Sequence, residues 1–547
     1  KEGLYLDTEF NQKLLEEYKP KIDAARQAIY DLPRVKKFTK KYNQVKIEKY
    51  IESIEAELEE LDYNDPKDKR KIDSREQKIS NIRAGIFTTK KEQELIRPLN
   101  LSSPVDLPQL MYSDSGFKFP VIKNNESGKP STDEDTLVEL RLTVKDPESP
   151  KAIFLDKLLE LRGLQKMYTT YIEGWHEKVQ DDSRLHGRYN IHGTDSNRFS
   201  SADPNMQQIP KTSVDPNIKK QLVAPPGYLY MAFDYSQAEL RMMAHLSGDE
   251  TYLEAFAKGV DPHLGIAAAK YGVSIEEASK AYEDETHPDY KLWKVRRKQA
   301  KQIAFGLIYG IGNKLLAVKL SDPKAGIIVT PEEAAKEMEV FFGQHPKIRK
   351  FKEKQEKFLR KHGYYTQLFG TKRRLPQIYS NDKQEVAYAI RLGLNFPCQG
   401  AAANMTNFGA ILVYWLMRQG KLPMMKEACT VHDAVYMYSK PQDINTWTVY
   451  TIWNILRNPS TKRYFGFQVD DVDMDMDFTI GRTMAEELPF IPGYDYRKML
   501  QPDFSVEEYM EEHKKYKHIH IKQFKERFNK QIKRYEKDFE RTHRMAS

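Results

Sequence analysis

The stretch TVHDAVYMY (residues 430–438) decides the fold, because it sets two polar residues between two apolar runs. Residues 427–431 before them and 435–438 after them are rich in apolar and β-forming side chains, which predicts two strands. A carboxylate at the junction of two buried strands is costly unless a positive charge meets it. The stretch therefore predicts a β-hairpin whose turn carries His432 and Asp433, with a cation close to Asp433.

A second carboxylate, Asp234, ends another apolar run in FDYSQAELR (233–241). Residues 228–234 are predicted to form a strand, and residues 237–246 a helix. One interpretation is that Asp234 caps this helix. If the strands that carry Asp234 and Asp433 are instead neighbours, their carboxylates can share the cations of a two-metal phosphoryl transfer. Hard cations prefer oxygen ligands, so the expected cofactor is a pair of Mg²⁺ ions, with Mn²⁺ as a substitute.

A third pattern lies in RRKQAKQIAFGLIYG (296–310), where four functional residues recur at every fourth position. On a helix this spacing places them on one broad face. Two cations followed by two aromatic rings suit a nucleotide, since cations bind phosphates and rings stack on a base. The alternative is a surface helix with a basic side and a core side. The four residues are Arg297, Lys301, Phe305 and Tyr309, and Gly310 ends the pattern.

Composition limits the class of protein. The chain has 547 residues, of which 40% are hydrophobic and 30% charged, as in a globular protein with several domains. It has two cysteines, Cys398 and Cys429, which excludes a disulfide framework and favours a reducing, cytoplasmic compartment. The longest mostly apolar run, 408–417, is too short to span a bilayer, and no basic-then-apolar leader opens the chain, so no membrane association is expected. The net charge is +8, and the excess of Lys and Arg over Asp and Glu within residues 513–547 alone accounts for it. This basic segment weakly suggests a polyanionic partner.

The remaining pattern is mostly helical, with no internal repeat. Residues 11–61, 152–178 and 260–375 show helical periodicity, and residues 62–83 are almost entirely polar, as in a solvated helical hairpin. Residues 99–135 are expected to be irregular, and residues 467–480 to form a further strand.

Taken together, the three patterns resemble motifs A, B and C of the family A DNA polymerases. DYSQAELR is similar to motif A, VHDA is similar to motif C, and the residues of the third pattern match motif B position by position. SNRFSSADPNMQQIP (196–210), RLGLNFPCQGAAAN (391–404) and GVDPH (259–263) resemble further segments of the family, in the same order. The resemblance implies an α+β right-hand fold with a helical thumb, an antiparallel-sheet palm and helical fingers.

The resemblance also implies domain limits. These are a thumb at 1–190, palm segments at 191–257 and 388–485, fingers at 258–387 with the motif B helix at 294–310, and a basic C-terminal extension at 486–547.

Roles are implied residue by residue. Asp234 and Asp433 would hold the metal ions, and Lys301 would also donate a proton to the leaving pyrophosphate. Phe305 would stack on the incoming nucleotide, Tyr309 would guard the templating position, and Glu239 would exclude a ribose 2′-hydroxyl. The incoming triphosphate would be bound by Arg297, Lys301 and His263. Primer and template would be contacted by Arg198, Asn205, Gln207, Arg391, Asn395, Gln399 and His432.

The implied function is template-directed addition of deoxynucleotides to a primer 3′-OH, by a monomer in the cytoplasm, or in a bacterial host's cytoplasm if a phage encodes it. LYLDTEF (4–10) contains an Asp-x-Glu pair that resembles a proofreading exonuclease motif, but the long helices that follow favour the start of a thumb. Proofreading is therefore expected to be absent. Two alternatives remain: a single-subunit RNA polymerase, against which Glu239 argues, and a catalytically degenerate DNA-binding scaffold.

Two features depart from the family pattern. Ala434 stands where the family usually has Glu. An acidic series with an Asp at every second position is expected to lie beside the motif C hairpin. One member of the series is a candidate to replace the missing carboxylate. The alternative is that the series forms a charged, solvated sheet edge. This series comprises Asp471, Asp473, Asp475 and Asp477. The second departure is an amphipathic basic helix predicted within 521–539, which could grip DNA, dock a replication partner or simply pack on the palm.

Overall fold

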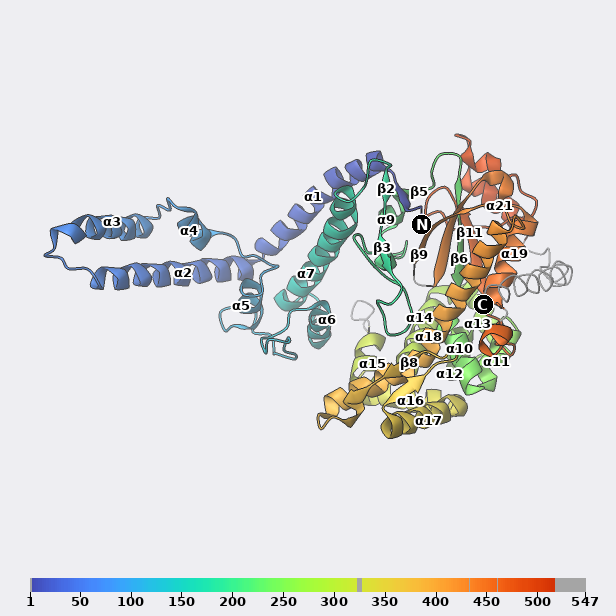
Figure 1. Ribbon diagram of the computed structural model, residues 1–547. Helices are drawn as coiled ribbons and strands as arrows, with labels where there is room; N and C mark the ends of the chain where they lie inside the picture. Colours follow the sequence, from blue (N-terminus) through green and yellow to red (C-terminus); the bar gives the residue numbers. More distant parts are fainter. Residues whose placement is uncertain (1, 322–326, 432, 460, 517–547) are drawn as a thin grey trace. The chain divides into compact units, whose positions relative to one another are not determined.

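The computed structural model describes the whole chain except residues 1, 322–326, 432, 460 and 517–547 (Figure 1). It divides into two compact units, residues 16–168 and residues 1–15 together with 169–547. Within the described residues, no helix is both long enough and apolar enough to cross a membrane. The predicted basic helix within 521–539 lies outside the described residues.

The first unit contains a helical arm. Helix α1 (Thr8–Tyr30) leads into α2 (Pro33–Glu59), and α3 (Pro66–Arg83) packs beside α2. Isoleucine and leucine side chains of α2 and α3 form a small core of their own, so the polar stretch 62–83 still contributes a buried stripe. Asp65 caps α3 by accepting a hydrogen bond from the Lys67 backbone N–H.

The rest of this unit packs around aromatic side chains. Phe117 and Phe154 stack with ring centroids 4.3 Å apart in a second core. The helix predicted at 152–178 is present but interrupted, because a π-helical turn (Met167–Ile172) separates two α-helices. The helices of this region are α4 (Lys90–Gln93), α5 (Asp106–Tyr112), α6 (Glu134–Thr143) and α7 (Pro150–Lys166), whereas α8 (Glu173–His176), after the π-helical turn, belongs to the second unit.

A five-stranded antiparallel sheet forms the centre of the second unit, in the order β12-β11-β6-β10-β9. The predicted hairpin is confirmed as β9 (Lys426–Val431) and β10 (Ala434–Ser439), and the predicted motif A strand is β6 (Leu229–Tyr235). The outer strands are β11 (Met476–Gly481) and β12 (Leu488–Pro489).

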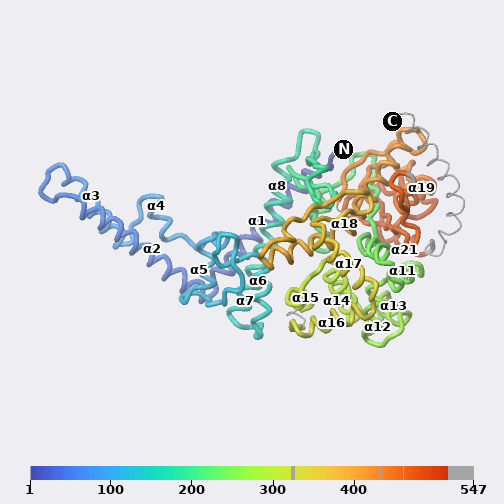
Figure 2. Tube along the Cα trace, turned by 60° about the horizontal axis from the view of Figure 1, so that its bottom comes forward, coloured from blue at the N-terminus to red at the C-terminus, as the bar shows by residue number. Residues whose placement is uncertain are grey.

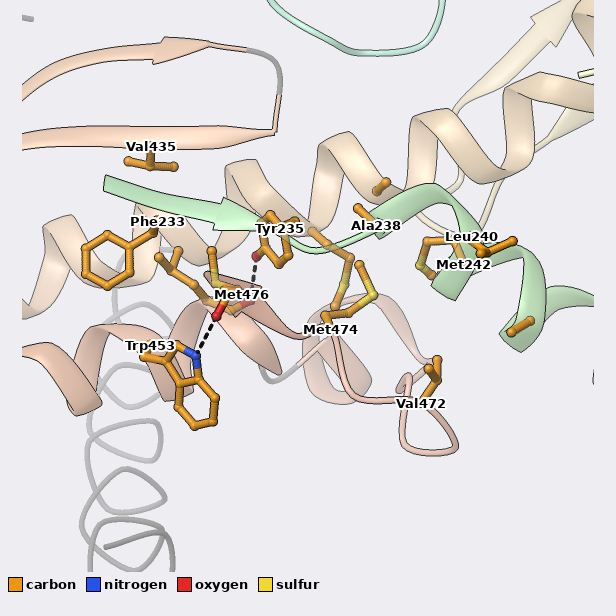
Figure 3. Close-up of a cluster of buried hydrophobic side chains, with 14 of the residues drawn as sticks. Phe233, Tyr235, Ala238, Leu240, Met242, Val435, Trp453, Val472, Met474 and Met476 are labelled. Carbon is orange, nitrogen blue, oxygen red and sulfur yellow. Dashed lines mark hydrogen bonds between the residues drawn. The ribbon is translucent and has the colours of Figure 1, made fainter. Parts of the chain in front are cut away.

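One face of this sheet is buried against helices. Phe233 of β6 and Val435 of β10 point into a core shared with α10 (Ala238–Ser247), α18 (Lys383–Arg418) and α19 (Thr446–Arg457). Figure 3 shows this core and the hydrogen bond that the Trp453 indole N–H donates to the Met476 carbonyl, 3.2 Å away. Successive side chains of a strand point to opposite faces, so the residues next to Phe233 and Val435 point to the other face of the sheet.

Helices α12 to α17 lie together in both views of the chain (Figures 1 and 2). The helix predicted at 294–310 is α14 (Tyr290–Ile308), and the long helical stretch 260–375 ends in a short hairpin. The other helices here are α11 (Glu250–Ala257), α12 (Pro262–Tyr271), α13 (Ile275–Glu283), α15 (Asn313–Leu320), α16 (Pro331–Gln344) and α17 (Pro346–His362). The remaining short elements are β1 (Leu4–Leu6), β2 (Arg184–Leu185), β3 (Arg188–Asn190), β4 (Ser200–Ala202), α9 (Pro216–Lys220), β5 (Leu222–Val223), β7 (Tyr364–Thr366), β8 (Lys372–Arg374), α20 (Thr461–Phe465) and α21 (Val506–Tyr516).

The strand predicted at 467–480 is wrong in extent and in position. It begins only at Met476, and it pairs with β6 instead of lying beside the β9–β10 hairpin. The acidic residues before it form a loop because side chains of neighbouring helices hold them. Asp471 contacts His245 at 2.6 Å, and the carboxylate of Asp473 pairs with Arg457. Only Asp477 of the acidic series lies on a strand.

Candidate active site

A row of three paired positions crosses the sheet at one end of β6. Asp234 is paired with Ala434 of β10 on one side and with Asp477 of β11 on the other. Paired residues of adjacent antiparallel strands point to the same face. This face is opposite the one that carries Phe233, and Asp433 lies next to Ala434 in the hairpin turn. The register therefore brings Asp234 and Asp433 to the same end of adjacent strands.

The environment of Asp234 disfavours its negative charge. Burial by the surrounding protein, and then the charges of Asp433 and Asp477, raise the pKa of Asp234 to about 6, although Lys211 and Lys219 act in the opposite direction. The side chain itself is still reached by solvent. A bound cation would relieve the repulsion between these carboxylates.

The donor set suits a hard divalent cation. In the described part of the chain, no group of three or more His, Cys, Asp or Glu side chains is arranged to hold a metal ion. Mg²⁺, however, is usually bound by one or two carboxylates, with water and substrate phosphates as its other ligands. Asp234 and Asp433 supply such a pair of oxygen donors, so the residues present fit this ion.

The raised pKa predicts a pH-dependent stability difference between the wild type and Asp234→Asn. In the unfolded chain Asp234 loses its proton near its ordinary pKa of 3.8, whereas in the folded chain it keeps the proton up to about pH 6. Ionisation therefore destabilises the folded wild type progressively between these two values. In chelator-containing buffer, the Tm of Asp234→Asn should rise relative to the wild type between pH 4 and 6 and stay constant above. A Tm difference that does not change with pH would contradict this.

Arg198 connects two of the predicted residues. One of its terminal nitrogens forms an ion pair with Glu239 and lies 3.4 Å from a carboxylate oxygen of Asp433. Burial raises the pKa of Glu239, and Arg198 partly offsets this effect. The guanidinium thus places a positive charge close to Asp433, beside the hairpin turn, where the sequence analysis expects metal ions.

Helix α14 presents the predicted nucleotide-binding face. Lys301 lies over the ring of Phe305 at 5.6 Å, and the rings of Phe305 and Tyr309 are 5.9 Å apart. These three side chains line a cavity of about 890 Å³ together with Arg391 of α18. The helix ends because Gly310 adopts a φ of +73°, a conformation that a side chain would strain.

Asp261 organises the phosphate-binding candidates through both of its carboxylate oxygens. Oδ1 caps α12 by accepting a hydrogen bond from the Leu264 backbone N–H at 2.8 Å. Oδ2 accepts two hydrogen bonds from Arg297, at 2.6 Å from Nη2 and 3.1 Å from Nε. His263 on α12 is fully buried, and neither ring nitrogen has a hydrogen-bond partner among the described residues. Burial lowers the pKa of His263, which keeps the imidazole neutral near pH 7.

The predicted primer–template residues occupy several elements. Gln207 donates a hydrogen bond to the Thr430 carbonyl at 2.6 Å, and Asn205 accepts one from the Gln207 backbone N–H. Asn395 and Gln399 follow Arg391 at intervals of four residues on α18. The Gln399 side chain acts to lower the pKa of Glu239. His432 lies outside the described residues.

Sequence reasoning missed two charged residues of this site. Lys211 is close enough to Lys301 and Asp234 to lower the pKa of both side chains. No periodic pattern surrounds Lys211, so the sequence carried no signal for it. Asp261 did have one, because an Asp followed by Pro at the start of a helical run indicates an N-cap.

Comparison with known proteins identifies the family of this chain. A family model described as DNA polymerase family A matches residues 69–486. The chain belongs to DNA polymerase family A. Its relatives include DNA polymerase I of Caldicellulosiruptor bescii, which is 33% identical over 61% of this chain and 36% of that protein. Thermostable DNA polymerase I of Thermus aquaticus is 32% identical over 62% of this chain and 37% of that protein. The chain thus spans little more than a third of these relatives' length.

A solved structure is also similar to this chain. The POL domain of Pol1 from M. smegmatis, in a complex with a DNA primer-template and dNTP, aligns with a TM-score of 0.63 at 24% identity. The alignment covers 89% of this chain and 68% of that one. This likeness confirms the predicted α+β polymerase fold of this family A chain.

Proposed function

We propose that this chain is a DNA-directed DNA polymerase, which adds deoxynucleotides to a primer 3′-OH as a template directs. The observation that carries the proposal is the strand register, which brings Asp234 and Asp433 together from distant parts of the sequence. The cationic helix α14 and the family membership support it. Primer–template DNA and deoxynucleoside triphosphates are the proposed partners.

The proposed cofactor is a pair of divalent cations, Mg²⁺ or Mn²⁺, held by Asp234 and Asp433. When bound, such ions stabilise the charge that develops on the attacking and leaving oxygens of a phosphoryl transfer. The protein's own contribution is to hold one carboxylate near the end of β6 and the other in the turn next to β10.

The proposed triphosphate site combines Arg297, Lys301 and His263. Burial, and then the charges of Lys211 and Arg297, lower the pKa of the Lys301 ammonium. A lowered pKa makes an ammonium a better proton donor, which suits transfer to a leaving pyrophosphate. His263, which is neutral and has no hydrogen-bond partner among the described residues, can donate one N–H to a phosphate oxygen.

Selection of the nucleotide and the template is assigned to neighbouring residues. Glu239, held by Arg198, would exclude a ribose 2′-hydroxyl, while Phe305 and Tyr309 would contact the base and the templating position. The proposed primer and template contacts are Arg198, Asn205, Gln207, Arg391, Asn395, Gln399 and His432. The proposed domains are a thumb at 1–190, palm segments at 191–257 and 388–485, fingers at 258–387 and a C-terminal extension at 486–547.

The deciding experiment is primer extension on a defined template with the purified chain. We expect extension with deoxynucleotides and Mg²⁺, none with a chelator, and far less with ribonucleotides. Preferred incorporation of ribonucleotides would favour an RNA polymerase. Tight DNA binding without any extension would instead support a non-catalytic scaffold.

Substitutions at Asp261 should separate its two roles, which are to cap α12 and to hold Arg297. Asp261→Asn keeps an oxygen that can cap α12 but removes the charge that holds Arg297, so we expect a roughly fivefold to tenfold higher KM for the nucleotide, corresponding to a lost charge-assisted pair of about 1–1.5 kcal/mol. The kcat should change little, and so should the Tm. Asp261→Ala should raise KM similarly and also lower the Tm, because the cap is lost. Steady-state kinetics and thermal melts measure both effects, and an unchanged KM in both variants would refute this role.

Asp477 is the remaining candidate to replace the carboxylate missing at Ala434. It faces Asp234 directly across the strand pair, so its charge should strengthen cation binding by about 1 kcal/mol at such a separation. We expect Asp477→Asn to need about fivefold more Mg²⁺ for half-maximal extension. Asp471→Asn, in the preceding loop, is the control and should behave as the wild type. Equal Mg²⁺ requirements in all three proteins would leave Ala434 without a replacement.

A further inference from the structure

The side chain of Lys352, on α17, is more buried than those of the neighbouring lysines. Lys352 is partly buried, whereas Lys350 and Lys354 on the same helix are exposed. Burial lowers the pKa of Lys352 to about 8, and Cys398 and Glu356 partly offset this effect. A buried ammonium is costly unless polar groups meet it, so the partners of Lys352 indicate its role.

The partner of this ammonium is the backbone at the end of α14. Lys352 donates a hydrogen bond to the carbonyl of Leu307, in the last turn of that helix. The same carbonyl accepts a hydrogen bond from the Gly310 backbone N–H at 3.1 Å, and the Ile311 N–H donates to the Gly306 carbonyl at 2.8 Å. These two backbone bonds form a Schellman motif, in which Gly310 adopts the left-handed conformation. Lys352 therefore binds the hydrogen-bonded turn that ends α14.

A second group also favours a cation at this place. Lys352 Nζ lies over the ring of Phe342, on α16, 5.5 Å from its centroid. The face of an aromatic ring attracts a cation, and so does the C-terminal end of a helix, which carries partial negative charge. The ring and the Leu307 carbonyl together hold the ammonium against the end of α14.

The turn that Lys352 binds carries Tyr309. The Tyr309 backbone N–H donates to the Phe305 carbonyl at 3.0 Å, and the two rings line the cavity of about 890 Å³. Lys352 is not among the described residues that line this cavity. An effect of Lys352 on a bound nucleotide would therefore pass through the turn and the ring of Tyr309.

We propose that Lys352 is a positioning residue for nucleotide selection, because its ammonium fixes the turn that holds Tyr309 at the templating position. The inference rests on the proposed polymerase function, which assigns that position to Tyr309. The alternative is a lysine that only stabilises the fold. Its loss would then lower the stability and the rates with all nucleotides together.

The test compares correct and mismatched incorporation by the wild type and by Lys352→Met. We expect kcat/KM for a mismatched nucleotide, relative to the correct one, to rise about threefold to tenfold when the cation at the helix end is lost. The kcat for the correct nucleotide should stay within about threefold of the wild type. The Tm should not fall, because methionine removes a buried charge and the Leu307 carbonyl keeps its bond to Gly310.

The matched control is Lys354→Met, which replaces an exposed lysine of the same helix and should select nucleotides as the wild type does. Lys352→Arg keeps a cation at the end of α14 and should restore selection to within about twofold of the wild type. In a Tyr309→Ala background, Lys352→Met should change selection by less than about twofold, because the ring that Lys352 positions is already absent.

Several results would overturn the inference. These are unchanged selection in Lys352→Met, a Tm that falls together with the rates for correct and mismatched nucleotides, a loss of selection in Lys352→Arg as large as in Lys352→Met, and an equal effect of Lys352→Met with and without Tyr309. All of these comparisons use a wild type that extends primers. Absence of extension by the wild type would instead refute the proposed function, so the two failures are distinguishable.

Discussion

Asp433→Asn should reduce the rate of nucleotide addition by about 10³-fold or more, with little change in DNA affinity. The expected size follows from the several kcal/mol of transition-state charge stabilisation that a bound divalent cation supplies. Asp433 lies at the hairpin turn, and the residue that follows it, Ala434, has no carboxylate that could take its place. Single-turnover incorporation of one nucleotide measures the effect, because it separates chemistry from product release.

The control for this variant is Asp475→Asn, in the loop before β11. The carboxylate of Asp475 lies 3.8 Å from Arg241, and the substitution removes a nearby charge without replacing a residue of the row formed by Ala434, Asp234 and Asp477. It should leave the rate within about twofold, because Asp475 is half exposed and lies outside that row. If Asp433→Asn retains the wild-type rate while remaining folded, the proposed two-carboxylate site is wrong.

The local elements of this site could be predicted because their signals are short-range. The hairpin at 430–438 is indicated by two apolar runs and a polar turn, and the shared face of Arg297 and Lys301 by a spacing of four. Both features depend only on the periodicity of strands and helices. The structure confirms them within one or two residues at most ends.

The acidic stretch 471–477 shows where periodicity misleads. Aspartates at alternate positions indicate one face of a strand, yet only Asp477 is on β11. The preceding loop is held by His245 and Arg241, whose side chains come from α10. Such partners are distant in sequence, so a local pattern cannot reveal that they compete with strand formation.

The same limit explains why the pairing of Asp261 with Arg297 was not predicted. GVDPH resembles a segment whose His binds the triphosphate, but it does not show which residue meets the second carboxylate oxygen of Asp261. The packing of α12 on α14 decides that contact. Long-range ion pairs of this kind can be predicted only when the arrangement of the helices is known, and sequence patterns do not give that arrangement.

Lys301→Met should lower kcat by about 10²–10⁴-fold, the range that a positioned proton donor contributes. Lys301→Arg distinguishes the two tasks assigned to this side chain. Arginine keeps the positive charge for phosphate binding, but it is too weak an acid to release a proton near neutral pH. We therefore expect Lys301→Arg to recover most of the nucleotide affinity while remaining at least tenfold slower than the wild type. Lys291→Met, an exposed lysine near the start of the same helix, is the matched control and should be active.

The pH dependence of kcat provides an independent test of the same assignment. Burial and the charges of Lys211 and Arg297 lower the pKa of Lys301, so the group loses its proton at a lower pH than an ordinary lysine does. The wild-type kcat should fall on the alkaline side as this proton is lost. Lys211→Gln removes one of the two repelling charges, raises the pKa of Lys301 and should move this alkaline limb to higher pH. An alkaline limb that is unchanged in Lys211→Gln and persists in Lys301→Arg would show that another group donates the proton.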